Sequence, residues 1–196
     1  RMRCNVNVVV SSFNIDRLDA VIDLAAQHLG SAIALLTLKR CQDNEPSRVV
    51  TATQLRDALI PLLSGWRHSF PVILRGFPMC TVPGFEHLDA DLVYIRQGVT
   101  VSDNFQRQDE FMSMYGPAVA ASANPLPECK ICSLRDICYS RQVFREKPND
   151  PGNLPISSSK DPRQVLVANR TDPKDVELTI SRLIAGKEAV LAGKQS

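Results

Sequence analysis

The spacing of apolar residues over the first thirty positions constrains the fold more than any other feature of the chain. One face of a strand from Cys4 would be apolar, with Cys4, Val6, Val8 and Val10, and the other would be mainly polar, with Asn5, Asn7, Val9 and Ser11. From Ile15 to Leu29 the apolar residues recur with the spacing of a helix that packs on one side, and Gly30 follows as a favoured end. A strand followed by a helix is therefore predicted.

The next forty residues repeat this order. The nearly continuous apolar run Ala32 to Leu38 is typical of a strand buried on both faces of a parallel sheet. Thr51 and Gln54 have the spacing of a capping box, so a second helix should begin there, and we expect Pro61 to interrupt it. A third strand is predicted at Phe70 to Leu74. The pattern predicts an α/β fold of β-α-β-α-β order with parallel strands.

A cluster of three cysteines is the strongest chemical signal. Cys129 and Cys132 form a C-x2-C turn, and Cys138 follows after five residues. A C-x2-C turn lets two sulfurs approach one ion or one cluster edge, and a short return of the chain can bring the third beside them. These three thiolates are therefore predicted to hold one metal centre.

Such a centre needs a fourth ligand. Cys80 is the best candidate because it ends the loop Gly76-Phe77-Pro78-Met79-Cys80, directly after the third predicted strand. Cys4 and Cys41 lie in the α/β part and are interpreted as ordinary buried or loop cysteines. The predicted ligand set is Cys80, Cys129, Cys132 and Cys138.

The residue types favour an iron–sulfur cluster over the alternatives. Thiolate sets select zinc or iron–sulfur clusters rather than hard cations. Structural zinc sites commonly pair two knuckles, and this chain has a single C-x2-C, so zinc is the second interpretation. Disulfides come third, because they require an oxidising compartment and no signal peptide is evident. We expect a cytoplasmic protein.

Charge and hydropathy exclude two classes of partner. The 23 basic and 21 acidic residues leave a formal net charge of +2, too small to attract nucleic acid strongly. The longest apolar run, Ala32 to Leu36, is far shorter than the roughly 18 to 20 residues of a membrane span. Neither a nucleic acid nor a membrane is an expected partner. Because the residue pattern of a strand begins almost at Arg1, we also expect the chain to be a fragment of a longer protein.

The distribution of Pro, Gly and polar residues along the chain suggests three parts. Residues 1–75 are the expected α/β segment, and 76–145 are a loop-rich region with several Pro and Gly that includes the cysteine motif. Residues 146–196 begin with a polar linker, Lys147 to Ser159, in which no chemistry is evident, and end in a helix predicted at Glu177 to Leu191.

Two stretches together resemble the radical S-adenosylmethionine enzymes. The Val6 to Val10 strand, the helix after it and the Ala32 to Leu38 strand look like the later βα units of the partial (β/α) barrel in that family. The loop that ends in Cys80 and the C-x2-C-x5-C motif resemble the auxiliary-cluster extensions of the SPASM or twitch type, which follow the barrel. The resemblance covers roughly residues 1–140.

The resemblance implies a function as well as a fold. It implies a 4Fe-4S auxiliary cluster on the four cysteines, beside a barrel that binds S-adenosylmethionine and a small-molecule or peptide substrate. On that interpretation Asn7 faces the cofactor, although half-exposure of an incomplete sheet explains this polar residue equally well. The expected partner is an electron donor protein such as flavodoxin or ferredoxin.

The chain departs from the family in one respect. The C-x3-C-x2-C loop, which ligates the cluster that cleaves S-adenosylmethionine, occurs nowhere in the 196 residues. The intact protein is therefore expected to be an enzyme, whereas this chain alone should be inactive and its catalytic residues cannot be assigned.

Two other interpretations remain open. Iron–sulfur nucleases of the RecB type also combine a distant cysteine with a terminal C-x2-C-x5-C. They additionally need an Asp followed by Glu-x-Lys on adjacent strands, and after Asp89 and Asp91 no such strand follows. The third interpretation is a non-catalytic interaction module that binds zinc.

Overall fold

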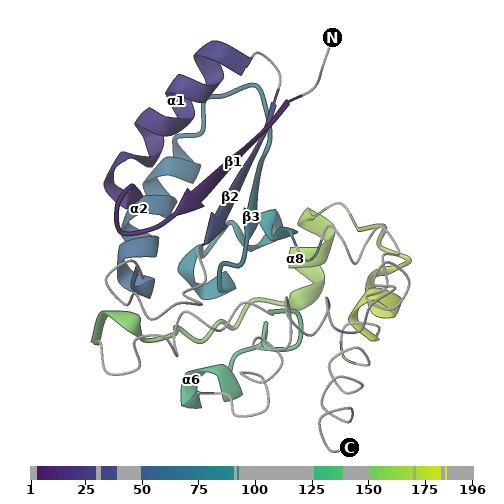
Figure 1. Cartoon of the computed structure of the whole chain (residues 1–196). Helices are drawn as coiled ribbons and strands as arrows, with labels where there is room; N and C mark the ends of the chain where they lie inside the picture. The colour runs from purple at the N-terminus through teal and green to yellow at the C-terminus, as the bar shows by residue number, and fades with distance from the viewer. Residues whose placement is uncertain are drawn as a thin grey trace, which may run out of the picture.

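The α/β part is built around a small parallel sheet (Figure 1). The computed structural model describes residues 4–29, 32–38, 50–90, 92, 126–138, 151–169, 171–181 and 184. The sheet has the order β1-β2-β3, and both neighbouring pairs are parallel. Its strands are β1 (Cys4–Val10), β2 (Ala32–Leu38) and β3 (Val72–Arg75). The register places Val8 opposite Leu36, and Leu36 opposite Leu74.

The helices connect these strands in the predicted order and cover one face of the sheet (Figure 1). A short turn, η1 (Ile15–Arg17), leads into α1 (Leu18–Leu29), and α2 (Ala52–Ser64) precedes β3. Three parallel strands joined by two helices are as expected for the β-α-β-α-β segment. Its closure into a partial barrel remains a prediction.

The termini of α2 test two local predictions. The capping box is confirmed, because Thr51 Oγ1 accepts from the Gln54 N–H at 3.2 Å and Gln54 Oε1 accepts from the Thr51 N–H at 2.8 Å. The predicted interruption at Pro61 is wrong, since α2 continues to Ser64. Pro61 lies in the last turn of α2 and is exposed to solvent. The helix ends at Gly65, whose N–H donates to the carbonyls of Leu63 and Pro61.

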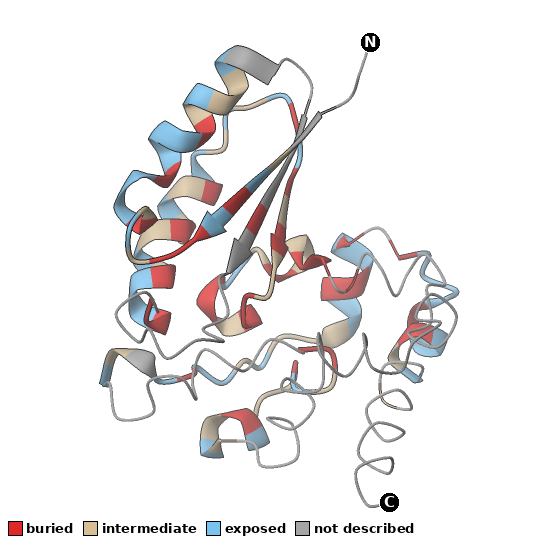
Figure 2. Cartoon of the chain, viewed as in Figure 1, coloured by how far each residue is buried: buried red, intermediate tan, exposed pale blue. Residues whose placement is uncertain are grey.

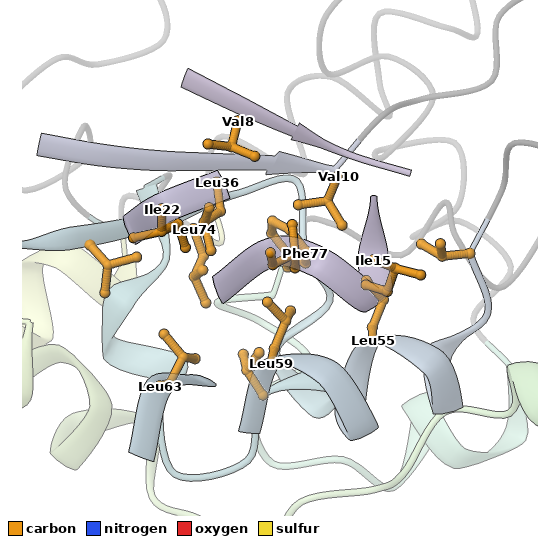
Figure 3. Packing of buried hydrophobic residues seen from close by; sticks show 14 of the residues in the cluster. Val8, Val10, Ile15, Ile22, Leu36, Leu55, Leu59, Leu63, Leu74 and Phe77 are labelled. Atoms are coloured by element: carbon orange, nitrogen blue, oxygen red, sulfur yellow. The ribbon is translucent and has the colours of Figure 1, made fainter. Parts of the chain in front are cut away.

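The first apolar cluster lies between the sheet and the two helices (Figure 3). Figure 2 shows that buried residues of both helices face the sheet, whereas their outer sides are exposed. The strands contribute Val8, Val10, Leu36 and Leu74, and the helices contribute Ile22, Leu55, Leu59 and Leu63 among others. Burial of Leu-sized side chains contributes about 1.5 to 3 kcal/mol each, so this cluster supplies the main stabilisation of the α/β part.

A second, smaller apolar cluster lies beyond the sheet. The short elements that follow β3 are η3 (Met79–Thr81), η4 (Glu86–Leu88), α6 (Pro127–Lys130), η5 (Pro151–Asn153) and α8 (Pro162–Ala168), and of these η3 and α8 contribute members of the cluster. Its members are Met79, Leu92, Leu134, Ile137, Cys138, Val165, Leu166 and Val176. The cluster therefore combines residues from both sides of position 145, the predicted boundary between the second and third parts.

The C-terminal helix prediction is only partly within the described residues. Residues 176–181 and residue 184 are helical, and the remainder of the predicted helix lies outside the described part. In the portions of the chain that are described, no helix has the length and apolar character to cross a membrane.

Candidate metal centre

All four predicted ligand residues line one cavity. Cys80, Cys129, Cys132 and Cys138 surround it together with Met79, Leu134, Arg135, Pro155, Ile156 and Ser158. All four cysteines are free thiols. The cavity thus joins a cysteine that follows β3 to three cysteines almost fifty residues later in the chain.

Cys80 is positioned by the turn at the carboxyl end of β3. Gly76 has φ +79°, a conformation that side chains other than glycine rarely adopt, and it redirects the chain out of the sheet. The η3 turn follows, in which the Pro78 carbonyl accepts from the Thr81 N–H at 2.8 Å and from the Thr81 hydroxyl at 2.6 Å. Cys80 lies within this turn, half-buried against the first apolar cluster. Ligands commonly bind at this edge of parallel sheets.

The other three cysteines are brought together by α6 and the turn after it. Leu126 is the N-cap of α6 and has an extended backbone conformation. Its carbonyl accepts from the Cys129 N–H at 2.9 Å, so Cys129 lies in the first turn of α6. The Leu134 carbonyl accepts from the Cys138 N–H at 2.9 Å, which folds the chain back toward the knuckle. This is the return predicted from the spacing of Cys132 and Cys138.

The turn between the cysteines is anchored by apolar side chains. Leu134 and Ile137 are 2% and 1% exposed, and both belong to the second cluster. Ile131, inside the C-x2-C knuckle, is instead 77% exposed. The knuckle therefore has its sulfurs toward the cavity and its outer side toward solvent.

The electrostatics of Cys80 reflect the proximity of the other thiols. The pKa of Cys80 is raised to about 12, mainly by burial and also by negative charge on Cys138 and Cys129, and a backbone hydrogen bond from Ile156 and the charge of Arg56 act in the opposite direction. Like charges close together disfavour the thiolate form. A bound cation would remove this penalty, because it attracts all of the thiolates at once.

The segment predicted as a linker without chemistry contacts the cysteines directly. The Ser158 N–H donates to Cys132 Sγ at 3.3 Å, and a backbone hydrogen bond from Ile156 lowers the pKa of Cys80. In return the Ser158 carbonyl accepts from the Ser133 N–H at 2.8 Å. Sequence reasoning missed Ile156 and Ser158 because they contribute backbone groups, whose role no side-chain pattern reveals.

Asn7 does not line the cysteine cavity. It is exposed on β1, whereas its neighbour Val8 is buried against the helices. Since successive residues of a strand point to opposite faces, Asn7 lies on the face that α1 and α2 do not cover. Its predicted contact with S-adenosylmethionine remains a prediction.

The cysteine cavity differs from a formed coordination sphere. Over the described ranges, no three His, Cys, Asp or Glu side chains have the arrangement that would hold a metal ion. The four thiols are the ligand type that a thiolate-bound metal centre requires, and they line the same cavity. The match between this site and a metal centre therefore rests on the identity of the four residues.

A larger hollow, of about 390 Å³, lies elsewhere, between α1 and α2. Its wall includes Asp23, which is paired with Arg67 and lies 3.3 Å from His68 Nε2. None of the four cysteines lines it. The chemistry that the sequence predicts therefore belongs to the smaller cavity.

Comparison with known proteins adds no assignment: no family model matches the chain, and neither a curated protein nor a solved structure matches it.

Proposed function

We propose that Cys80, Cys129, Cys132 and Cys138 hold a 4Fe-4S cluster, and that the chain is the C-terminal part of a radical S-adenosylmethionine enzyme in which this cluster is auxiliary. The observation that carries the proposal is the convergence of four thiols, from two distant segments, on one cavity. Convergence of this kind is required of a thiolate-bound centre and is not required of structural cysteines.

The ligand set supports iron–sulfur chemistry. Four cysteines without histidine or carboxylate form the usual ligand set of a 4Fe-4S cluster. When bound, such a cluster supplies one-electron transfer. The chain itself holds the thiolates, and the buried Leu134 and Ile137 support the turn that presents them.

The larger enzyme is proposed from the order of the parts. A parallel β-α-β-α-β segment precedes the cysteine cavity, and the first ligand follows directly after β3. In the intact enzyme a second cluster, on a C-x3-C-x2-C loop outside this chain, would cleave S-adenosylmethionine. A small-molecule or peptide substrate, an electron donor protein such as flavodoxin or ferredoxin, and a cytoplasmic location belong to this proposal.

The test begins with the metal itself. We would purify and reconstitute the chain without oxygen, then measure iron, sulfide, zinc and the absorption spectrum. The expected result is about four irons and four sulfides per chain with a broad band at about 400 nm. Cys80→Ala and Cys132→Ala should each lose the band. Cys4→Ala, which lies in β1 outside the cavity, is the matched control and should retain it.

Other results would select another function. One zinc per chain without colour would overturn the iron–sulfur proposal and leave a zinc-binding interaction module. A cluster accompanied by Mg²⁺-dependent DNA cleavage would instead indicate the RecB-type nuclease. Production of 5′-deoxyadenosine from S-adenosylmethionine by the full-length protein is the positive test of the radical enzyme.

A further inference from the structure

We propose that residues 155–160, which we name the strap, are part of the metal centre and raise its reduction potential by donating two backbone N–H groups to two of the ligand sulfurs. The inference rests on the proposed iron–sulfur cluster and goes beyond it, because it assigns a redox role to residues that are not ligands.

The geometry of the strap aims these groups at the sulfurs. Residues 154–160 have no helical or turn hydrogen bonding, and in an extended chain the N–H groups of alternate residues point to the same side. Ile156 and Ser158 are such a pair: the Ser158 N–H donates to Cys132 Sγ at 3.3 Å, and a backbone hydrogen bond from Ile156 lowers the pKa of Cys80. Ser157 and Ser159, the intervening residues, are exposed.

Contacts at both ends hold the strap in place. Before it, the Thr53 hydroxyl donates to the Gly152 carbonyl at 2.7 Å, which ties the chain to α2. At its far end Lys160 Nζ lies 2.8 Å from Glu86 Oε2, a carboxylate whose side chain is 5% exposed. Both tethers join the strap to elements that precede the C-x2-C knuckle, so its position does not depend on the knuckle alone.

The middle of the strap is fixed by Ser133, the residue directly after Cys132. Its N–H and its hydroxyl both donate to the Ser158 carbonyl, at 2.8 and 2.9 Å. Because the N–H and carbonyl of an extended residue point to the same side, this bond and the bond from Ser158 to Cys132 support each other. The strap is thus held to the knuckle by one main-chain hydrogen bond and by side-chain bonds at Ser133 and Cys132.

These donors favour the reduced form of the centre. One-electron reduction of a cluster, for example by dithionite, adds a negative charge that is shared among the irons and sulfurs. An N–H group pointed at a ligand sulfur stabilises that charge more in the reduced than in the oxidised form, and hydrogen bonds to sulfur are a recognised determinant of cluster potential. Loss of either donor should therefore lower the potential.

The experiment removes one N–H group at a time by substitution with proline. Ile156→Pro removes the donor to Cys80, and Ser158→Pro removes the donor to Cys132. Ser158→Ala keeps the N–H and removes only the hydroxyl, and Ser159→Pro places proline on the strap without touching either donor. The reconstituted proteins are compared by iron and sulfide content and by anaerobic redox titration.

The expected result is a full cluster in each protein, with the reduction equilibrium constant lowered about tenfold in each donor variant, which is 59 mV for one electron. Ser158→Ala and Ser159→Pro should have the same reduction potential as the wild type. A wild type that binds no cluster overturns the proposed function and this inference together. If the wild type binds a cluster and neither Ile156→Pro nor Ser158→Pro has a lower reduction potential, this inference is overturned and the proposed function stands.

A measurement on the wild type covers the case in which proline prevents loading. Electron–nuclear double resonance of the reduced cluster, in H2O and in D2O, detects exchangeable protons close to the sulfurs. Selective 15N labelling of isoleucine and serine identifies their source. Strong coupling to the labelled nitrogens supports the strap, and exchangeable protons without such coupling would overturn its role.

Discussion

The two apolar clusters of this chain are stabilised by different means. The first is a continuous layer between a parallel sheet and two helices, and its members include completely buried residues such as Leu36, Leu55 and Leu59. The second is smaller, and it is assembled from short helices and turns around Leu134 and Leu166. The first cluster can be stabilised by burial alone, whereas a core as small as the second generally needs a metal or a covalent link.

The cysteine cavity lies where the two clusters meet. Cys80 packs against the first cluster, and Cys132 and Cys138 contribute to the second. A metal bound to all of them would connect a self-sufficient region to a dependent one. The proposed difference, that the second region depends on a metal for stability and the first does not, can therefore be tested directly by experiment.

Removal of the proposed metal should have the largest effect. Binding free energy at a structural metal site is also folding free energy, so chelation should strongly reduce the protection of amides in residues 126–138 and 162–169. Amides of β2 and α2 should keep their protection. Hydrogen exchange with and without metal measures both. Equal loss of protection in the two regions would show that the α/β part depends on the metal as well.

Truncation of one leucine in each cluster sharpens the comparison. Leu59→Ala should lower the free energy of unfolding of the α/β part by about 2 to 5 kcal/mol because it leaves a cavity in the main core. Trp66, the only tryptophan, packs on that cluster and reports its unfolding in urea.

Leu134→Ala is the matched change in the second cluster, where the side chain is 2% exposed. It should reduce the metal content and leave the Trp66 transition nearly unchanged. If Leu134→Ala shifts that transition as far as Leu59→Ala does, the two regions unfold as one unit and the distinction between them fails.

A smaller effect is expected from the ion pair at the end of the strap. Lys160→Met leaves the buried Glu86 carboxylate without its 2.8 Å partner. Because the Lys160 side chain is 35% exposed, the loss should be about 1 to 3 kcal/mol rather than the larger value of a fully buried pair. Hydrogen exchange of α8 measures it. The double variant Glu86→Gln with Lys160→Met should recover part of the loss, and no recovery would show that packing, not charge, is responsible.

Features set by neighbouring residues could be predicted from the sequence. The capping box of α2 needs only Thr51 and Gln54, and both of its hydrogen bonds are present. The strands and helices of the first region follow apolar periodicity, which reports burial directly. The C-x2-C-x5-C spacing limits how far three sulfurs can separate, and all three line one cavity, whereas their binding of one metal remains a prediction.

Long-range backbone contacts could not be predicted in this way. The pairing of Ser158 with Ser133 joins residues 25 positions apart and uses main-chain groups that every residue carries. The run Ser157-Ser158-Ser159 has the composition of a linker, and composition does not show where its N–H groups point. Pro61 was misjudged because propensity alone takes no account of tertiary packing, and Leu59 and Leu63 on either side of it are buried in the first cluster.

The separation of Cys80 from Cys129 has a consequence for the topology of the chain. A metal held by both closes a loop that contains residues 81–128. By the chain-entropy relation for crosslinks, closure of a loop of this length removes roughly 4 kcal/mol of conformational freedom from the unfolded chain. Because that quantity grows only with the logarithm of loop length, doubling the loop would change it by about 0.6 kcal/mol. The crosslink would therefore tolerate large insertions between its two ends, whereas the strap has fixed spacing and would not.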